Sequence, residues 1–409
     1  MNAVNKKFSR WRKSVRYLFE SSIFNREQEK NWGVDDFRRE ANACIEARFG
    51  EVDARKRAAQ FGTSYIEQDQ DGRKEVLSML VKEFGVEPTK VSDQLKLYQD
   101  SEKDDLDLRA AKLREALKPR RQALLTRFTS LKDGVKFLVD MRAELFKYSK
   151  EDVSFKILDK ELYELFGIWF DPGFLDIQRV TWSSSASLLE KLMEYEANHS
   201  IISWQDLKNR LDGDRRCYTL FHSRMSQEPL AILHVALNKG IATNVQELLD
   251  VETEPTEPET ADTAVFYSVT SPQEGLRGIS FGEIIIKQAV RELRSELPDL
   301  KTFVTLSPIP GFRKWLNEHL NPDDFSGLPF TLDTLDNALK IAALDKDKSW
   351  VQTLEKLLTR KCLEYLTTTD NGRPLNPVTR FHLRNGAYIH KINFMGDISK
   401  NGLESAAGM

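Results

Sequence analysis

Apolar residues recur at helical spacing along the first 170 residues of the chain. The segments 35–50, 73–85 and 131–150 place them at intervals of three and four, which predicts amphipathic helices. Residues 105–125 continue this pattern but contain Pro119, which cannot continue a helix without losing a hydrogen bond. Residues 1–170 are therefore predicted to form an all-helical N-terminal domain.

The pattern changes after residue 170, where short runs rich in β-branched and aromatic residues predict strands. The runs 229–237 and 263–271 are predicted to be neighbouring antiparallel strands. From 263 to 306, the order strand, glycine-rich turn, long helix and strand predicts a parallel βαβ unit. Residues 171–409 are therefore predicted to be a mixed α/β domain. The predicted strands are 175–182, 217–223, 229–237, 263–271 and 301–308, and the predicted helices are 187–197, 203–211 and 282–297.

Composition narrows the class of protein. The 409 residues include 60 basic and 63 acidic side chains, so the net charge is −3 and a dedicated nucleic-acid binder is disfavoured. No apolar run approaches the roughly 20 residues that a membrane span needs. The three cysteines lie far apart, which excludes a disulfide framework and a zinc knuckle and fits a reducing compartment.

Positive charge is concentrated at the start of the chain, where six basic residues precede the first acid, Glu20. An acid-poor start of this kind is typical either of a mitochondrial presequence or of a basic first helix. The helix is favoured, because no small-residue cleavage context follows and four apolar residues share one helical face. We expect a cytoplasmic protein, with the mitochondrial matrix as the alternative. The four apolar residues are Phe8, Trp11, Val15 and Leu18.

A glycine-rich loop leads from a predicted strand into a long helix. Glycines at such a point let the backbone approach an anion, and the helix N-terminus offers free N–H groups. The loop lacks GxGxxG and GxxxxGK[ST], but its RGxxxG pattern resembles the pyrophosphate loop of the GNAT acetyltransferase fold, which binds coenzyme A. The alternative is a turn that only admits close helix–strand packing. The loop residues are Gly275, Leu276, Arg277, Gly278, Ile279, Ser280, Phe281 and Gly282.

Ser307 ends the next predicted strand, before the rigid turn Pro-Ile-Pro-Gly. Loops at the carboxyl ends of parallel strands are where α/β proteins hold their ligands. On spacing alone, the favoured interpretation of Ser307 is a turn serine that hydrogen-bonds its own backbone.

Several separate motifs resemble the malonyl-CoA decarboxylase family in the correct order. They are WFDPGFLDIQRVTWSSSASLLEKL (169–192), DRRCYTLFHS (214–223), EPLAILHVAL (228–237), AVFYSVTSPQEGLRGISFG (264–282), LSPIPGFRKWL (306–316) and LNPVTRFHLRNGAYIHKINFMGDIS (375–399). The resemblance implies a catalytic domain of acetyltransferase-like (GNAT) fold at 171–409, after a helical domain that serves packing or oligomerisation. It also implies homo-oligomers, either dimers or tetramers.

The resemblance implies decarboxylation of malonyl-CoA to acetyl-CoA and carbon dioxide, with no required cofactor and no metal. The family's catalytic histidine falls on His382 and its catalytic serine on Ser307. We expect His382 to protonate the acetyl-CoA enolate, and Ser307 to hydrogen-bond the malonyl carboxylate or carbonyl. A hydrolytic role is not expected, because the chain lacks a GxSxG elbow.

The sequence differs from the family's pattern at two active-site positions. Relatives continue beyond the position of Met409 into a segment with an active-site tyrosine, so we expect a truncated catalytic domain. Either Tyr388 or Tyr267 would substitute for that tyrosine, or activity would be reduced. Some relatives have an acidic residue at Ser280, and a serine cannot supply that charge.

Two other functions fit the same motifs. An acyl-CoA-dependent acyltransferase would use the same loop, and a catalytically impaired protein would still bind coenzyme A. All six histidines lie after residue 170. Of those other than His382, we expect His199, His222, His234 and His319 to be structural, and His390 to be an unlikely second candidate.

Overall fold

The computed structural model describes residues 32–409 except 254 and 346. The basic segment at 1–19 and its predicted helix lie outside the described residues. The chain divides into two compact units. The first comprises Met1–Asp176 with two later segments, Phe221–Pro229 and Gln273–Ile279. The second comprises Ile177–Leu220, Leu230–Pro272 and Ser280–Met409.

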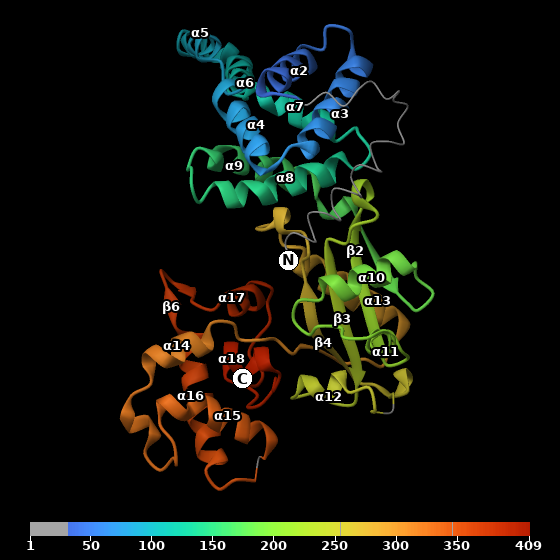
Figure 1. Ribbon diagram of the computed structural model, residues 1–409, viewed down its shortest axis with the longest axis vertical. Coiled ribbons are helices and arrows are strands. Elements are labelled where there is room, and N and C mark those ends of the chain that lie inside the picture. The colour runs from blue at the N-terminus through green and yellow to red at the C-terminus, as the bar shows by residue number, and fades with distance from the viewer. Residues whose placement is uncertain (1–31, 254, 346) are drawn as a thin grey trace. The chain divides into compact units, whose positions relative to one another are not determined.

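The first unit is helical up to residue 174 in its described part, as the spacing of apolar residues predicts. Its core is built on aromatic rings in edge or tilted contact, including Phe61 with Phe37 and with Phe128 at centroid distances of 5.1 and 6.1 Å. Pro119 precedes the first turn of α7, so the predicted break is confirmed. Figure 1 shows the helices α2 (Val34–Glu46), α3 (Glu51–Glu67), α4 (Gln70–Glu83), α5 (Pro88–Gln99), α6 (Leu106–Ala116), α7 (Arg120–Phe128), α8 (Gly134–Tyr148) and α9 (Phe155–Trp169).

A five-stranded sheet in the order β1-β2-β3-β4-β5 is the centre of the second unit, apart from the ends of β1 and β2 that belong to the first. Strands β2 and β3 are buried along almost their whole length, which explains why β3 consists mainly of apolar residues. The predicted antiparallel pair and the predicted parallel βαβ unit are both confirmed. The strands are β1 (Leu175–Val180), β2 (Arg215–His222), β3 (Ala231–Asn238), β4 (Thr263–Thr270) and β5 (Thr302–Thr305).

Strand β4 is irregular at its centre. His234 pairs with Ser268, but the next residue, Val235, pairs with Phe266, so Tyr267 is the extra residue of a β-bulge. The pairing of β4 with β5 also stops at Phe266. Beyond that point the two strands diverge, so residues after β5 can contact other elements.

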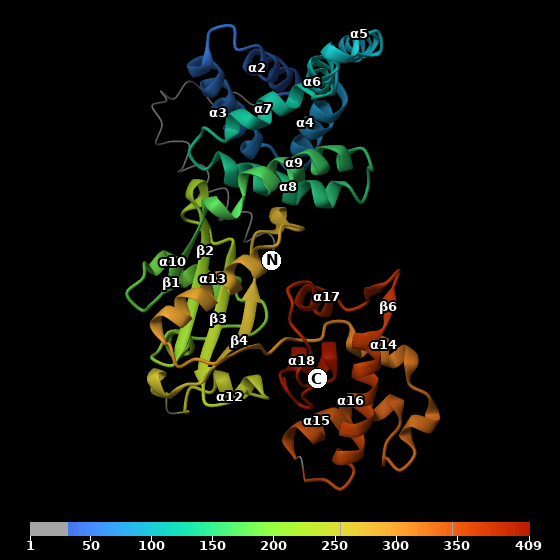
Figure 2. The ribbon, with the colours of Figure 1, turned by 180° about the vertical axis from the view of Figure 1, so that it is seen from behind.

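Helices cover both faces of the sheet. The long helix α13 lies in front of the sheet in Figure 2, whereas α10 and α11 lie in front of it in Figure 1, which shows the opposite side. Leu192 of α10 and Leu207 of α11 pack against Cys217 and Ile232 of the sheet in one apolar cluster. The bounds of these helices and of the short α12 are α10 (Ala186–Tyr195), α11 (Trp204–Asn209), α12 (Val245–Leu249) and α13 (Phe281–Glu296).

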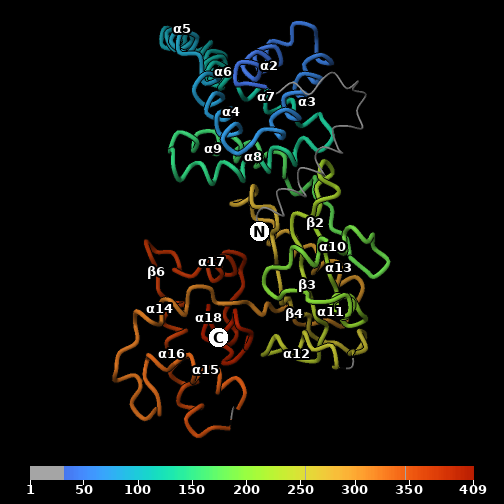
Figure 3. Tube along the Cα trace, viewed as in Figure 1, coloured from blue at the N-terminus to red at the C-terminus, as the bar shows by residue number. Residues whose placement is uncertain are grey.

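The rest of the second unit is a helical cluster with a core of its own, seen in the orange and red part of Figure 3. Phe312 and Leu316 of α14 pack in it with Leu358 and Cys362 of α16. A two-stranded ribbon, β6 (Thr369–Asp370) and β7 (Arg373–Pro374), leads into α17. The helices are α14 (Phe312–His319), α15 (Leu335–Leu344), α16 (Val351–Thr367), α17 (Pro377–Arg384) and α18 (Lys400–Ala406).

Candidate active site

Ser307 stands two residues beyond the end of β5. The turn after it, Pro308-Ile309-Pro310-Gly311, ends at Gly311, which has a φ of +81° and begins α14. A side chain at Gly311 would also place its Cβ 2.9 Å from the Tyr365 hydroxyl. Both the positive φ and the close Tyr365 hydroxyl therefore require glycine at this position. Pro308 and Pro310 restrict the backbone of the same turn, because the ring of proline fixes φ.

His382 lies near the end of α17. Asn376 caps this helix by accepting a hydrogen bond from the backbone N–H of Thr379 at 2.8 Å, and Pro377 occupies the first helical position. Both choices are typical of helix starts. The cap directs α17 so that its histidine meets the end of β5.

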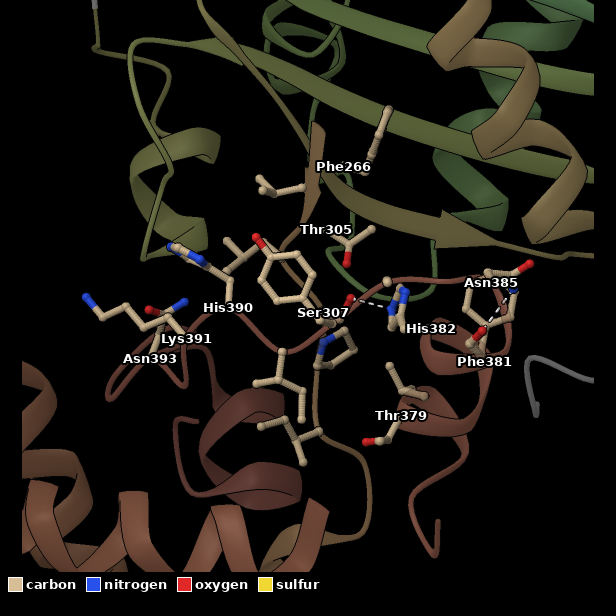
Figure 4. A pocket seen from close by; sticks show the side chains of 18 of the residues that line it. Phe266, Thr305, Ser307, Thr379, Phe381, His382, Asn385, His390, Lys391 and Asn393 are labelled. Atoms are coloured by element: carbon tan, nitrogen blue, oxygen red, sulfur yellow. Dashed lines mark hydrogen bonds between the residues drawn. The ribbon is translucent and has the colours of Figure 1, made fainter. Parts of the chain in front are cut away.

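The Oγ atom of Ser307 and the Nε2 atom of His382 are 2.9 Å apart, and Figure 4 shows them facing each other. Burial lowers the pKa of His382 below its ordinary value of 6.5. The ring is therefore neutral at pH 7. Among the described residues no carboxylate is bonded to this ring, so the pair differs from the triad of serine hydrolases.

A cavity of about 750 Å³ surrounds this pair within the second unit. Its walls come from β5, from one side of α13, from α17 and from the loop that follows α17. Basic side chains contribute to the wall, namely Lys287 of α13 and both His390 and Lys391 of the loop. A cavity of this volume is within the range of pockets that bind small molecules.

Only the end of the predicted coenzyme A loop approaches the pair. An added Cβ at Gly282 would lie 3.5 Å from the ring of Phe381, the neighbour of His382. Gly275 lies instead in the first unit, where an added Cβ would be 1.8 Å from the carbonyl oxygen of Val139. Arg142 donates hydrogen bonds to the carbonyl oxygens of Gly275 and Arg277 at 2.7 and 3.1 Å. The contacts of Gly275 and Arg277 are therefore those of a turn that admits close packing, which is the alternative to a coenzyme A site.

The remaining predicted residues have different surroundings. Tyr388 is 79% exposed and lines the cavity. Ser280 is the N-cap residue of α13, makes no capping hydrogen bond and is not part of the cavity wall.

Tyr267, the other suggested substitute for the family's tyrosine, is enclosed in the second unit. It is 1% exposed, lies outside the cavity wall and stacks on His234 at a centroid distance of 5.8 Å. Tyr267 is the extra residue of the β4 bulge, where the regular alternation of side chains across the sheet is interrupted.

Two polar residues of the cavity wall were not predicted as site residues from the sequence. His199 lines the cavity, and burial lowers its pKa. Asn376, buried at 0% exposure, also lines it. The only signal for Asn376 in the sequence is its place before Pro377 at a helix start, and no pattern distinguishes His199.

The described residues contain no group of three or more histidine, cysteine or acidic side chains that could hold a metal ion. The same residues include no helix long and apolar enough to cross a membrane. The groups that meet in the cavity are a hydroxyl, that of Ser307, and a neutral imidazole, that of His382. Such a pair can orient a carbonyl or carboxylate and can donate a proton.

Two family models match the chain. The model of the malonyl-CoA decarboxylase C-terminal domain matches residues 173–409, and that of the N-terminal domain matches residues 84–170. The mitochondrial malonyl-CoA decarboxylase of Anser anser anser is 36% identical over 391 residues, covering 87% of this chain and 77% of the relative. The Rattus norvegicus protein of the same name is 37% identical over 369 residues, covering 82% and 75%.

Solved structures agree with these sequence relatives. The crystal structure of malonyl-CoA decarboxylase from Rhodopseudomonas palustris has a TM-score of 0.80 at 35% identity and covers 92% of both chains. That from Agrobacterium vitis has a TM-score of 0.82 at 35% identity and covers 91% of both. The chain therefore belongs to the malonyl-CoA decarboxylase family.

Proposed function

We propose that this chain is a carboxy-lyase that converts malonyl-CoA to acetyl-CoA and carbon dioxide. The observation that carries the proposal is the 2.9 Å contact between Ser307 and His382 inside the cavity of a family member. The thioester carbonyl of malonyl-CoA is itself an electron sink. The reaction therefore needs correct orientation, stabilisation of an enolate and a proton, but no added cofactor.

In the proposed reaction the bond between C2 and the carboxylate breaks, and its electron pair passes into the thioester as an enolate. Ser307 hydrogen-bonds the malonyl carboxylate or the thioester carbonyl and holds the imidazole ring. His382 supplies the proton that forms the new C2–H bond, and the ring regains a proton from water. Because burial lowers the pKa of His382, the neutral ring is the form that donates at pH 7. An enolate carbon is basic enough to take a proton from a neutral imidazole.

We propose that coenzyme A lies between β5 and the start of α13, as in an acetyltransferase-like (GNAT) fold. Three features support this placement. Strands β4 and β5 are parallel and part after Phe266. The N-cap residue of α13, Ser280, makes no capping hydrogen bond with its side chain, and the N-terminus of a helix favours an anion such as a phosphate. Lys391 adds positive charge to the cavity wall.

We also propose that the helical unit mediates self-association. The support is the resemblance of residues 1–170 to the helical domain of an oligomeric family. Light scattering during gel filtration would give the stoichiometry, and a monomer would contradict the proposal. The sequence relatives carry the word mitochondrial in their names, so the matrix is a location to test beside the cytoplasm by cell fractionation.

The direct test of function is turnover by the purified chain. Malonyl-CoA should yield acetyl-CoA and carbon dioxide in equal amounts without added metal, measured by chromatography and by trapped gas. Acetyl transfer to an added amine in preference to decarboxylation would instead identify an acyltransferase. Tight acyl-CoA binding by calorimetry with no product would identify an impaired binding protein.

A further inference from the structure

Asn376 joins the two segments that carry the proposed catalytic pair. It lies six residues before His382 and is buried at 0% exposure. Its Nδ2 atom donates to the carbonyl oxygen of Pro310 at 3.1 Å. Its Oδ1 atom accepts from the backbone N–H and the hydroxyl of Thr379 at 2.8 and 3.2 Å. One amide thus fastens the turn after Ser307 to the first turn of α17.

The carbonyl of Pro310 is held from two sides. Besides Asn376, the hydroxyl of Tyr365 donates to it at 2.9 Å. Tyr365 belongs to α16, so three elements converge on one oxygen, three residues after Ser307. A carbonyl with two donors keeps one bond when either donor is removed, which makes the contribution of each donor separately measurable.

The second unit contains a second asparagine that caps a helix and also bonds a carbonyl far along the chain. Asn244 caps α12 with its Oδ1 atom, and its Nδ2 atom donates to the carbonyl oxygen of Met395 at 2.6 Å. Asn244 is also buried, at 8% exposure. The same change at Asn244 and at Asn376 should therefore disturb the fold by similar amounts, whereas only Asn376 connects Ser307 to His382.

We propose that Asn376 is a positioning residue that sets the separation of the Ser307 hydroxyl and the His382 ring. The inference rests on the proposed decarboxylase function. Asn376 does not transfer the proton itself. It acts by keeping the turn and the helix in register, so that the ring and the hydroxyl stay within hydrogen-bond distance while the substrate reacts.

The variant Asn376→Asp separates the two roles of the amide. An aspartate still accepts from Thr379 and caps α17, but an ionised carboxylate cannot donate to Pro310. We expect kcat to fall by about 10- to 100-fold, since small misplacement of reacting groups costs this much, while KM for malonyl-CoA changes less than about threefold. Asn244→Asp should lower the unfolding temperature by a similar amount and leave kcat within about twofold.

The double variant Ser307→Ala/Asn376→Asp separates positioning from general damage. Once the hydroxyl is absent, nothing remains for Asn376 to position against the ring, so the double variant should be about as slow as Ser307→Ala alone. Fully multiplicative losses in kcat would show independent structural damage and would overturn the inference. If Asn376→Asp does not fold, Tyr365→Phe removes only the second bond to Pro310. It should show a smaller loss with the same non-additivity, and additive behaviour there would overturn the inference equally.

The two ideas fail in different ways. A wild-type chain that releases no acetyl-CoA refutes the proposed function itself. A wild-type chain that turns over malonyl-CoA while Asn376→Asp keeps its kcat refutes only the positioning role.

Discussion

Ser307 and His382 are separated by 75 positions in the chain, yet the hydroxyl of one lies 2.9 Å from the ring nitrogen of the other. The contact exists because β5 stops pairing with β4 at Phe266 and because a capped helix, α17, brings its histidine to the freed end.

Replacing Ser307 by alanine removes the hydroxyl that we propose orients both the substrate and the ring. We expect kcat to fall by about 10²–10³-fold, the loss typical of one oriented donor at a developing oxyanion. The proposed reaction contains no acyl-enzyme, so intact-protein mass spectrometry during wild-type turnover should show no added acetyl or malonyl group. An accumulating adduct on Ser307 would require a nucleophilic mechanism instead.

The pH dependence follows from the lowered pKa of His382. A group whose pKa is lowered by burial loses its proton below pH 6.5, so the neutral ring should predominate from there upward. We expect kcat/KM to rise with pH as the ring deprotonates and to be level above about pH 6.5. A rate that instead declines through this range would mean that the imidazolium is the acid.

The glycines of the loop before α13 give a matched pair of variants. Gly275→Ala should destabilise the fold by about 1–3 kcal/mol, the usual cost of overpacking, because the new Cβ would collide with the Val139 carbonyl. Gly282→Ala meets only ordinary contacts at 3.4 and 3.5 Å, so the unfolding temperature should hardly change.

If coenzyme A phosphates approach the start of α13, Gly282→Ala should nevertheless raise KM for malonyl-CoA several-fold. Calorimetric titration with acetyl-CoA gives the same comparison without turnover. Unchanged affinity in this variant would remove Gly282 from the coenzyme A site.

A buried ion pair in the sheet predicts an effect on stability. Glu196 and His234 are 3.3 Å apart, and both side chains have 0% exposure. Burial acts to raise the pKa of Glu196, but His234 and hydrogen bonds from the backbone of His199 and from Ser268 lower it to about 2. Glu196→Gln should lower the free energy of unfolding by about 3–5 kcal/mol, because it leaves a buried charge without its partner.

Denaturant unfolding measures this loss, and the exposed Glu404→Gln is the control, expected to stay within about 0.5 kcal/mol. Since the pKa of Glu196 is lowered, its contribution is present above pH 4.5 and is lost as the pH falls toward 2. A wild-type stability that does not decline more steeply than that of Glu196→Gln in this range would contradict the role of the pair.

Much of the architecture could be predicted from periodicity. The five predicted strands and the helix at 282–297 are present with shifts of a few residues at their ends. Local spacing decides these elements because each one buries an apolar face of fixed period. The parallel pairing of β4 and β5 also followed from local order, since a strand, a helix and a strand connect in only one common way.

The site could not be assembled from spacing alone. The pairing of Ser307 with His382 was predicted through the family resemblance, because no periodic pattern links positions so far apart. The burial of Tyr267 could not be predicted, because Tyr267 is the extra residue of a bulge in β4 and bulges leave no reliable trace in sequence. Gly275 resembles a phosphate-loop glycine, yet its immediate constraint is the backbone of Val139.

The central claim is that this chain decarboxylates malonyl-CoA and that His382 provides the proton. The most direct measurement is the initial rate of acetyl-CoA formation by wild type and by His382→Asn at pH 7.5, with His319→Gln as the control for loss of a structural histidine. We predict turnover by wild type and by the control, and a loss of about 10²–10⁴-fold in kcat for His382→Asn. Equal rates for wild type and His382→Asn, or no acetyl-CoA from wild type, would contradict the account.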